Sequence, residues 1–145
     1  MRDLNKEFQN NQRQYAYDFD DVLRDYMLRA FSPFISAGSA LEMGCFEGDL
    51  TRRLSPLYKE FTVLDGSSLL IEKAKTNANE GVEFVMGRFE TQQFDKQFDD
   101  IFLVHALEHC DDAVLTLQRV RRWLKPSGRL FLVVPNANAP SRQIA

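Results

Sequence analysis

The chain has 145 residues, a length that suits one domain with a single hydrophobic core. Apolar residues make up 44% of it and charged residues 27%, as expected of a globular protein. The net charge of −3 argues against a protein that coats nucleic-acid phosphates, and no apolar run is long enough to span a membrane.

Cysteine usage and the N-terminal sequence bear on the cellular compartment. Cys45 and Cys110 are too few for a disulfide scaffold. Met1 is followed by a polar stretch that lacks the apolar core of a signal peptide. We therefore expect a protein of the reducing cytoplasm, with neither a membrane nor a nucleic acid as its partner.

The N-terminal part divides into a tail and a helix. Residues 1–14 are polar and rich in Asn and Gln, which predicts a flexible segment ahead of a domain that covers residues 15–145. Over residues 15–31, aromatic and aliphatic side chains recur at three- and four-residue spacing, which predicts an amphipathic helix. Pro33 follows at the position where proline often ends a helix.

Strands and helices then alternate. Strands are expected at residues 39–44, 61–65, 82–86, 100–105 and 129–134. Helices are expected at residues 49–57, from Ser67 or Ser68 to about Asn77, and at residues 111–124. A turn is expected at residues 125–128. The strand at 100–105 is almost continuously apolar, which suits a parallel strand buried on both faces. Strict alternation predicts an α/β fold, a doubly wound parallel sheet with helices on both faces, and such sheets bind ligands beyond the carboxyl ends of their strands.

Two features fall at that edge. The strand at 39–44 runs into a turn bracketed by Gly44 and Gly48, and the next strand ends on Asp65. Glycines let the backbone approach a ligand, and the helix that follows offers unpaired N–H groups. An acid about 20 residues after the glycines can accept both hydroxyls of a ribose. The pair predicts a site for an adenosine-type cofactor.

The spacing of the turn discriminates between such cofactors. It reads Gly-x-x-x-Gly and lacks the second glycine of Gly-x-Gly-x-x-Gly, and Phe46 would crowd a diphosphate. No Gly-Lys-Ser or Gly-Lys-Thr occurs, so a phosphate-binding loop of the Walker type is excluded. A cofactor without phosphates is favoured over a nicotinamide dinucleotide.

Four motifs, in the same order along the chain, resemble those of class I S-adenosylmethionine-dependent methyltransferases. The domain resembles methyltransferase domains of types 11, 12 and 23. The four motifs lie at residues 41–48, 63–67, 98–109 and 124–130. The resemblance implies a Rossmann-like sheet of order 3-2-1-4-5, with S-adenosylmethionine as cofactor and S-adenosylhomocysteine as product. It also implies methyl transfer to an unidentified acceptor, expected to be a small molecule. Members usually add two more strands, so we expect a domain truncated at its C-terminus.

The resemblance also implies residue roles. The Gly44–Gly48 turn would pack under the methionine half of the cofactor, and Glu42 would hold the turn or accept from the amino group. Asp65 would take the ribose hydroxyls, and Gly66 and Ser67 would flank the adenine. The implied cofactor-binding set is Glu42, Gly44, Cys45, Phe46, Gly48, Asp65, Gly66, Ser67, Arg88, Phe89, Glu90 and His105.

Two residues depart from the family pattern. Phe46 replaces a usual glycine, so the loop sits differently or the ring walls the methionine pocket. Arg88 replaces a frequent Asp, and because an arginine accepts no hydrogen bond, the adenine contacts are expected from backbone N–H groups or from Glu90.

Residues 105–109 read His-x-x-Glu-His, a zinc-protease signature that requires a helix. Here a strand end precedes it, so no metal site is expected. The resemblance places His105 at the methyl-transfer point, as a contact of cofactor or substrate and a weak candidate for a general base, and no catalytic residue is assigned. Tyr15 and Tyr17 form either a lid over the cofactor or ordinary packing.

Three functions are open on the sequence. The favoured one is a methyltransferase acting on a small molecule. The second is a non-catalytic methyltransferase-like module that binds a cofactor or a partner. The third is a nicotinamide oxidoreductase, which the spacing of the turn disfavours.

Overall fold

A computed structural model describes residues 5–6, 20–136 and 138 of the chain. At its centre lies a sheet whose neighbouring strands all run parallel, in the order β3-β2-β1-β4-β5. The strands are β1 (Ser39–Met43), β2 (Glu60–Asp65), β3 (Val82–Met86), β4 (Phe98–Val104) and β5 (Leu124–Val133). This order confirms the expected doubly wound architecture.

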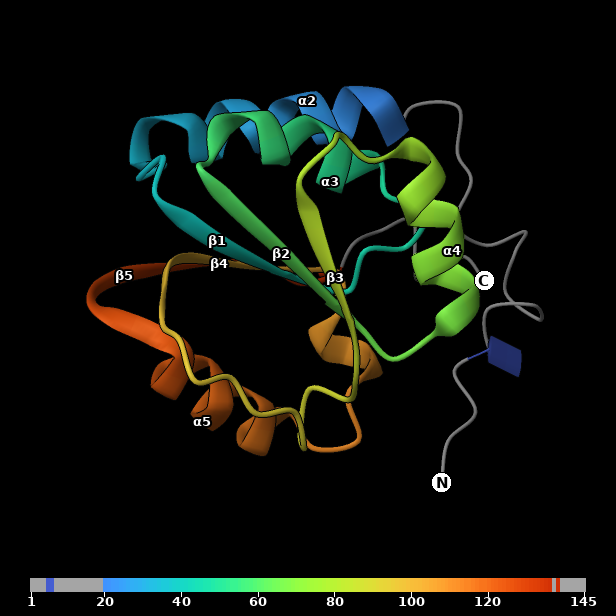
Figure 1. Cartoon of the computed structure of the whole chain (residues 1–145), viewed down its shortest axis with the longest axis vertical. Coiled ribbons are helices and arrows are strands. Elements are labelled where there is room, and N and C mark those ends of the chain that lie inside the picture. Colours follow the sequence, from blue (N-terminus) through green and yellow to red (C-terminus); the bar gives the residue numbers. More distant parts are fainter. Residues whose placement is uncertain (1–4, 7–19, 137, 139–145) are drawn as a thin grey trace.

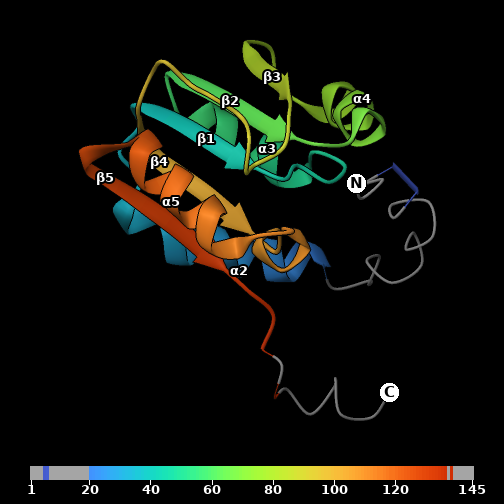
Figure 2. The same cartoon turned by 90° about the horizontal axis from the view of Figure 1, so that it is seen from below.

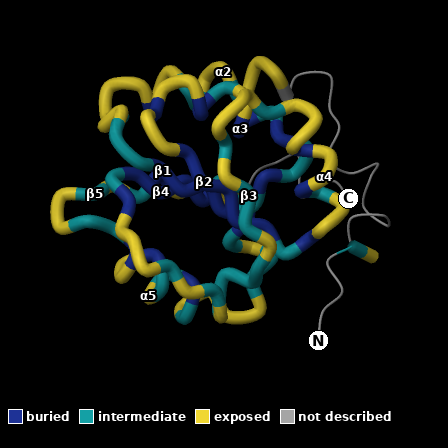
Figure 3. The backbone as a smooth tube through the Cα atoms, in the orientation of Figure 1, coloured by how far each residue is buried: buried dark blue, intermediate teal, exposed yellow. Residues whose placement is uncertain are grey.

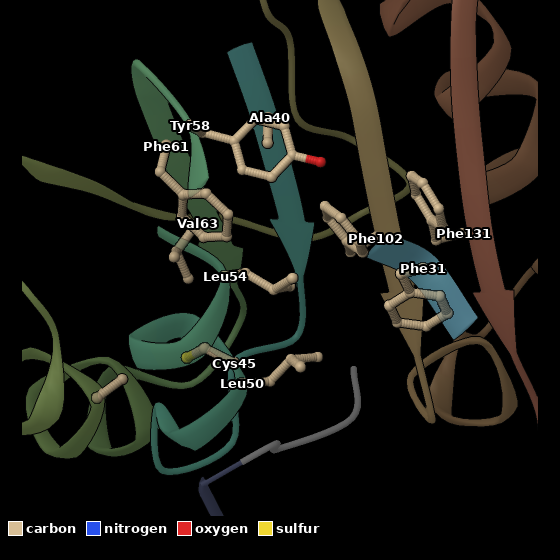
Figure 4. Packing of buried hydrophobic residues seen from close by; sticks show 11 residues of the cluster. Phe31, Ala40, Cys45, Leu50, Leu54, Tyr58, Phe61, Val63, Phe102 and Phe131 are labelled. Atoms are coloured by element: carbon tan, nitrogen blue, oxygen red, sulfur yellow. The ribbon is translucent and has the colours of Figure 1, made fainter. Parts of the chain in front are cut away.

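Helices cover both faces of the sheet (Figures 1 and 2). The helices are α2 (Asp20–Phe31), α3 (Asp49–Leu54), α4 (Ser68–Asn77) and α5 (Ala113–Trp123). Residues of α2, α3 and α4 share one hydrophobic cluster with the sheet, and residues of α5 share the other. In the first cluster, the rings of Phe102 and Phe131 stack with centroids 4.6 Å apart, and the Phe31 ring lies 5.1 Å from that of Phe131 (Figure 4).

Strand β4, between β1 and β5, is buried on both faces, as its apolar run predicts. Ile101 and Leu103 belong to the cluster under α5, whereas Phe102 belongs to the cluster under the other helices. All three side chains are fully buried. In Figure 3 the buried residues gather in β1, β2 and β4, whereas many residues of α2 and α5 are exposed. This arrangement fixes the carboxyl ends of the strands along one edge.

Several element boundaries have a clear local cause. Pro56 stands in a 3-10 turn (Ser55–Leu57) that ends α3 earlier than expected, because proline cannot donate the next helical hydrogen bond. Ser67 caps α4 by accepting from the Leu70 N–H at 3.2 Å, and Asp112 caps α5 by accepting from the Leu115 N–H at 2.8 Å.

The expected turn at 125–128 is wrong as a separate element. Leu124 already pairs with Phe98, and the next pair is Arg129 with Asp100. Between these two register pairs the chain advances five residues in β5 but only two in β4. The Lys-Pro-Ser-Gly segment therefore lies within β5 as an irregularity of the strand. A proline is tolerated there because the outer side of an edge strand has no partner that needs its N–H.

The chain ends lie partly outside the described residues. The expected helix at 15–31 is observed from Asp20, while Tyr15, Tyr17 and all of the 1–14 segment except residues 5–6 fall outside. Over the described residues, no helix has the length and apolar character that crossing a bilayer requires.

Candidate functional site

The glycine turn lies against the end of β2. The Gly44 N–H donates to the Leu64 carbonyl at 2.9 Å, and the Gly48 N–H donates to the Cys45 carbonyl at 2.8 Å. Gly44 and Gly48 have φ values of 84° and 85°. A Cβ at Gly44 would lie 2.9 Å from that of Ala106, and a Cβ at Gly48 would lie 2.7 Å from the Ala74 backbone. Only glycine fits at either end of the turn.

Phe46 occupies the middle of this turn with a left-handed φ of 47°. A non-glycine residue in this region carries a backbone strain of about 1–2 kcal/mol. Such strain persists where the surrounding structure over-determines it, and it is common at ligand sites. The ring is half-buried, and the left-handed φ is the conformation that the usual glycine would adopt without strain.

The Asp65 carboxylate joins the turn to α4. One oxygen accepts from the Cys45 N–H at 2.9 Å, and the other accepts from the Ser67 N–H at 2.8 Å. Burial raises the pKa of Asp65, and the hydrogen bonds from Ser67 and Cys45 oppose that rise. Burial also raises the pKa of Cys45, so this side chain is a thiol that fills space.

A second acid, Glu42, lies in β1 beneath the turn. Its Oε2 accepts from the Thr51 hydroxyl of α3 at 2.6 Å, while its Oε1 is buried with no hydrogen-bond partner. Burial raises the pKa of Glu42 to about 8, and the Thr51 hydrogen bond opposes this, while the charges of Asp65 and Asp49 add to it. An unpartnered buried carboxyl oxygen is the kind of atom that a ligand satisfies.

The N-terminal segment supplies a contact that sequence reasoning missed. The Asn5 side chain accepts from the Ser67 hydroxyl at 2.6 Å and donates to the Ser68 hydroxyl at 3.3 Å. Asn5 therefore stands at the N-terminus of α4, beside the residues expected to flank the adenine. The polar composition around it contains no periodic signal that could have located this contact.

The loop after β3 begins at Gly87, whose N–H donates to the Asp65 carbonyl at the end of β2 at 3.0 Å. Its charged side chains then engage the segment before α5. Arg88 forms an ion pair with Asp111 and lies 3.7 Å from Glu90, and Glu90 accepts from the Asp111 N–H at 3.0 Å. These side chains fasten two loops together.

Phe89 lies between Arg88 and Glu90 in the sequence and packs against the hydrophobic cluster under α5. A Cβ at Gly44 would lie 3.7 Å from its ring. The structure thus brings Phe89 to the glycine turn, whereas the side chains of Arg88 and Glu90 are engaged with the loop before α5.

His105 follows β4 in a left-handed conformation with φ of 50°. Its N–H donates to the Val133 carbonyl at 2.8 Å, and its Nδ1 lies 3.7 Å from the Glu108 carboxylate. The ring is exposed at 47%. Residues 107–109 form a single 3-10 turn, so the zinc signature lacks the α-helix that it requires. In the part of the chain that the structure describes, no group of three or more His, Cys, Asp or Glu is arranged to hold a metal ion.

Comparisons with known proteins agree with this geometry. A family model described as a methyltransferase domain matches residues 41–132. The mitochondrial ubiquinone biosynthesis O-methyltransferase of Schizosaccharomyces pombe is 30% identical over 116 residues, which cover 74% of this chain and 42% of that protein. The ubiquinone biosynthesis O-methyltransferase of Pelagibacter ubique is 23% identical, covering 90% of this chain and 56% of that protein. The chain spans about half the length of these relatives.

Solved structures have the same fold. A complex of DhpI with SAM and HEP superposes with a TM-score of 0.78 at 26% identity, covering 97% of this chain and 66% of that one. The N-methyltransferase NodS of Bradyrhizobium japonicum, in complex with S-adenosyl-L-homocysteine, superposes with a TM-score of 0.74 at 23% identity, covering 85% and 70%. The family match extends over more than half of the chain. The chain therefore belongs to the methyltransferase domain family, of the class I, S-adenosylmethionine-dependent kind.

Proposed function

We propose that the protein binds S-adenosylmethionine at the carboxyl edge of the sheet and transfers its methyl group to a small molecule, releasing S-adenosylhomocysteine. The observation that carries this proposal is the connection of Asp65 to the Gly44–Gly48 turn. One carboxylate fixes the turn after β1 and the start of α4 through the Cys45 and Ser67 N–H groups. The turn, which would face the methionine half of the cofactor, and the start of α4, which would face the adenosine half, are thereby fixed relative to each other.

Asp65 is proposed to bind the ribose while it keeps these backbone bonds. An ionised carboxylate has about four lone-pair sites, of which the Cys45 and Ser67 N–H groups use two and the Cys45 thiol, 3.5 Å from the oxygen that the Cys45 N–H contacts, uses a third. The residues around it fit a phosphate-free nucleoside, because the turn provides close backbone approach without the spacing that a diphosphate needs. Gly66 and Ser67 would flank the adenine.

Adenine recognition is proposed to come from the main chain of the 87–90 loop. Arg88 accepts no hydrogen bond and is paired with Asp111, and the Glu90 side chain accepts from the same segment. Both side chains would act by holding this loop against the segment before α5. Phe89, beside the turn, contributes apolar surface.

The cofactor supplies an electrophilic methyl group, so the chain chiefly has to align it with the acceptor. His105 is the polar side chain best placed to meet an acceptor, because it is half-exposed at the end of β4. Its left-handed backbone is fixed by the bond to the Val133 carbonyl. A proton acceptor is required only if the nucleophile must lose a proton early, so His105 stays a weak candidate for that role.

The activities for which several relatives are named support a small-molecule acceptor. These relatives include ubiquinone biosynthesis O-methyltransferases, an (S)-coclaurine N-methyltransferase and a trans-aconitate 2-methyltransferase. The free cysteines fit a reducing compartment, and we propose a cytoplasmic location. The second candidate is a non-catalytic module that holds the cofactor, which the engagement of Arg88 and the strained Phe46 favour.

The test is formation of S-adenosylhomocysteine from S-adenosylmethionine with a panel of hydroxyl, amine and carboxylate acceptors. We expect turnover with at least one acceptor and a loss of at least tenfold in Asp65→Asn. The matched control is Glu83→Gln, which alters an acid of β3 that pairs with Lys96 on the surface. Equal rates in wild type and Asp65→Asn would refute the proposed site. Binding without product across the whole panel would support the non-catalytic candidate.

A further inference from the structure

Glu42 is a carboxyl group that the fold buries with only half of its hydrogen-bonding capacity used. The side chain is 2% exposed, in the middle of the sheet. The Thr51 hydroxyl donates to Oε2 at 2.6 Å, and no described group donates to Oε1. An ionised carboxylate in such a place would be strongly disfavoured, because burial without a partner penalises the charged form.

The groups that face Glu42 make ionisation still less favourable. Asp65 approaches from β2 and Asp49 from α3, and both raise its proton affinity. Cys45, in the turn, is an uncharged thiol. From β4 the register partner is Phe102, which is apolar. Three arginines, Arg24, Arg52 and Arg53, form ion pairs with Asp49.

We propose that Glu42 is protonated in the ligand-free site and releases this proton to solvent when the positively charged amino group of the cofactor binds, so that binding at neutral pH is coupled to proton release. This inference rests on the proposed function, because it takes the ligand to be an adenosyl amino acid. An opposite charge brought next to a carboxyl favours its ionised form. The same charge would satisfy the oxygen that the empty site leaves without a partner.

A consequence for selectivity follows. An ionised Glu42 without a compensating cation is the unfavourable state, so only a ligand with an ammonium group drives the release. A neutral nucleoside such as methylthioadenosine shares the adenosine and the sulfur but has no amino group. It should occupy the adenosine part of the site without releasing a proton. Glu42 would thus distinguish the complete cofactor from its nucleoside fragments.

The experiment is isothermal titration calorimetry with S-adenosylhomocysteine in buffers of different ionisation enthalpy, which yields the number of protons released per ligand. With a Glu42 pKa of about 8, we expect about 0.9 proton at pH 7 and about 0.2 at pH 8.5. Methylthioadenosine should release none. Glu42→Gln should bind the ligand more weakly and release none at either pH.

Two further variants keep the test decisive if Glu42→Gln folds poorly. Asp100→Asn alters the other described carboxyl with an unpartnered buried oxygen, which lies in β4 and pairs in register with Ala40, and should keep the full release. Thr51→Val removes the donor that favours the ionised form, so proton release at pH 8.5 should rise above the wild-type value. Binding without proton release in the wild type would overturn this inference alone. No binding of any adenosyl ligand would overturn the proposed function and this inference together.

Discussion

Replacing Glu42 by Gln should change how stability depends on pH in the ligand-free protein. The carboxyl has a pKa of about 8 when folded and near 4.5 when exposed. Between these values the folded state holds a proton that the unfolded state has lost. The free energy of unfolding therefore falls as pH rises through this window, by up to about 1.4 kcal/mol per pH unit, and becomes independent of this group above pH 8.

The expected magnitude is large on the scale of protein stability. With these two pKa values, the contribution of Glu42 to the free energy of unfolding decreases by about 2–3 kcal/mol between pH 5 and pH 7. Whole domains are stable by only about 5–15 kcal/mol. Gln keeps the size of the side chain and the acceptor for Thr51, and it has no proton to exchange. Other titrating groups are common to both proteins, so they cancel in the difference.

The assay is urea denaturation of both proteins at pH 5 and pH 7, followed by circular dichroism. We expect the free energy of unfolding of Glu42→Gln, relative to wild type, to rise by about 2–3 kcal/mol from pH 5 to pH 7, with equal denaturant slopes. Placing an amide in the site also has an effect on the free energy of unfolding that does not depend on pH. This effect is the same at pH 5 and pH 7, so it cancels when the two values are subtracted. A difference that stays constant within about 0.5 kcal/mol would refute the account of Glu42 as a buried, protonated acid.

Two further substitutions test the fold around the site. Gly48→Ala should lower the free energy of unfolding by about 2–4 kcal/mol in urea, because the new Cβ would meet the Ala74 backbone at 2.7 Å. Gly81→Ala, which has the same positive φ but open space, should lower it by no more than about 1–2 kcal/mol, and equal losses would contradict the steric argument. Tyr58→Phe should cost about 1–3 kcal/mol, since it removes the hydroxyl that donates to buried Asp100 at 2.6 Å. A thermal unfolding midpoint identical to that of the wild type would show that this bond is dispensable.

The sequence predicted that the glycine turn and Asp65 lie together, because their positions depend on strand order and direction. Gly44 and Asp65 each follow a strand, and parallel strands bring their carboxyl ends to one edge. The apolar run of β4 likewise predicted a strand buried on both faces, which Phe102 and Leu103 confirm. The cofactor roles of the individual residues remain predictions.

What the sequence could not predict depends on contacts between distant residues. The ion pair of Arg88 with Asp111 joins two loops, and the contact of Asn5 with Ser67 spans 62 residues. Neither has a periodic pattern. The unpartnered Glu42 oxygen is likewise a property of the packed surroundings. The segment at 125–128 has the composition of a turn, but composition carries no information on whether a neighbouring strand pairs on either side of it.

The most direct test of the account is thermal unfolding of the chain with S-adenosylmethionine, S-adenosylhomocysteine, NAD or no ligand, in parallel with Asp65→Asn. A ligand at 100 times its dissociation constant stabilises by about 2.7 kcal/mol, which raises the melting temperature of a domain of this size by several degrees. We predict this rise with the two adenosyl-sulfur ligands, none with NAD, and its loss in Asp65→Asn. A rise with NAD alone, or one that Asp65→Asn leaves unchanged, would contradict the proposed cofactor site.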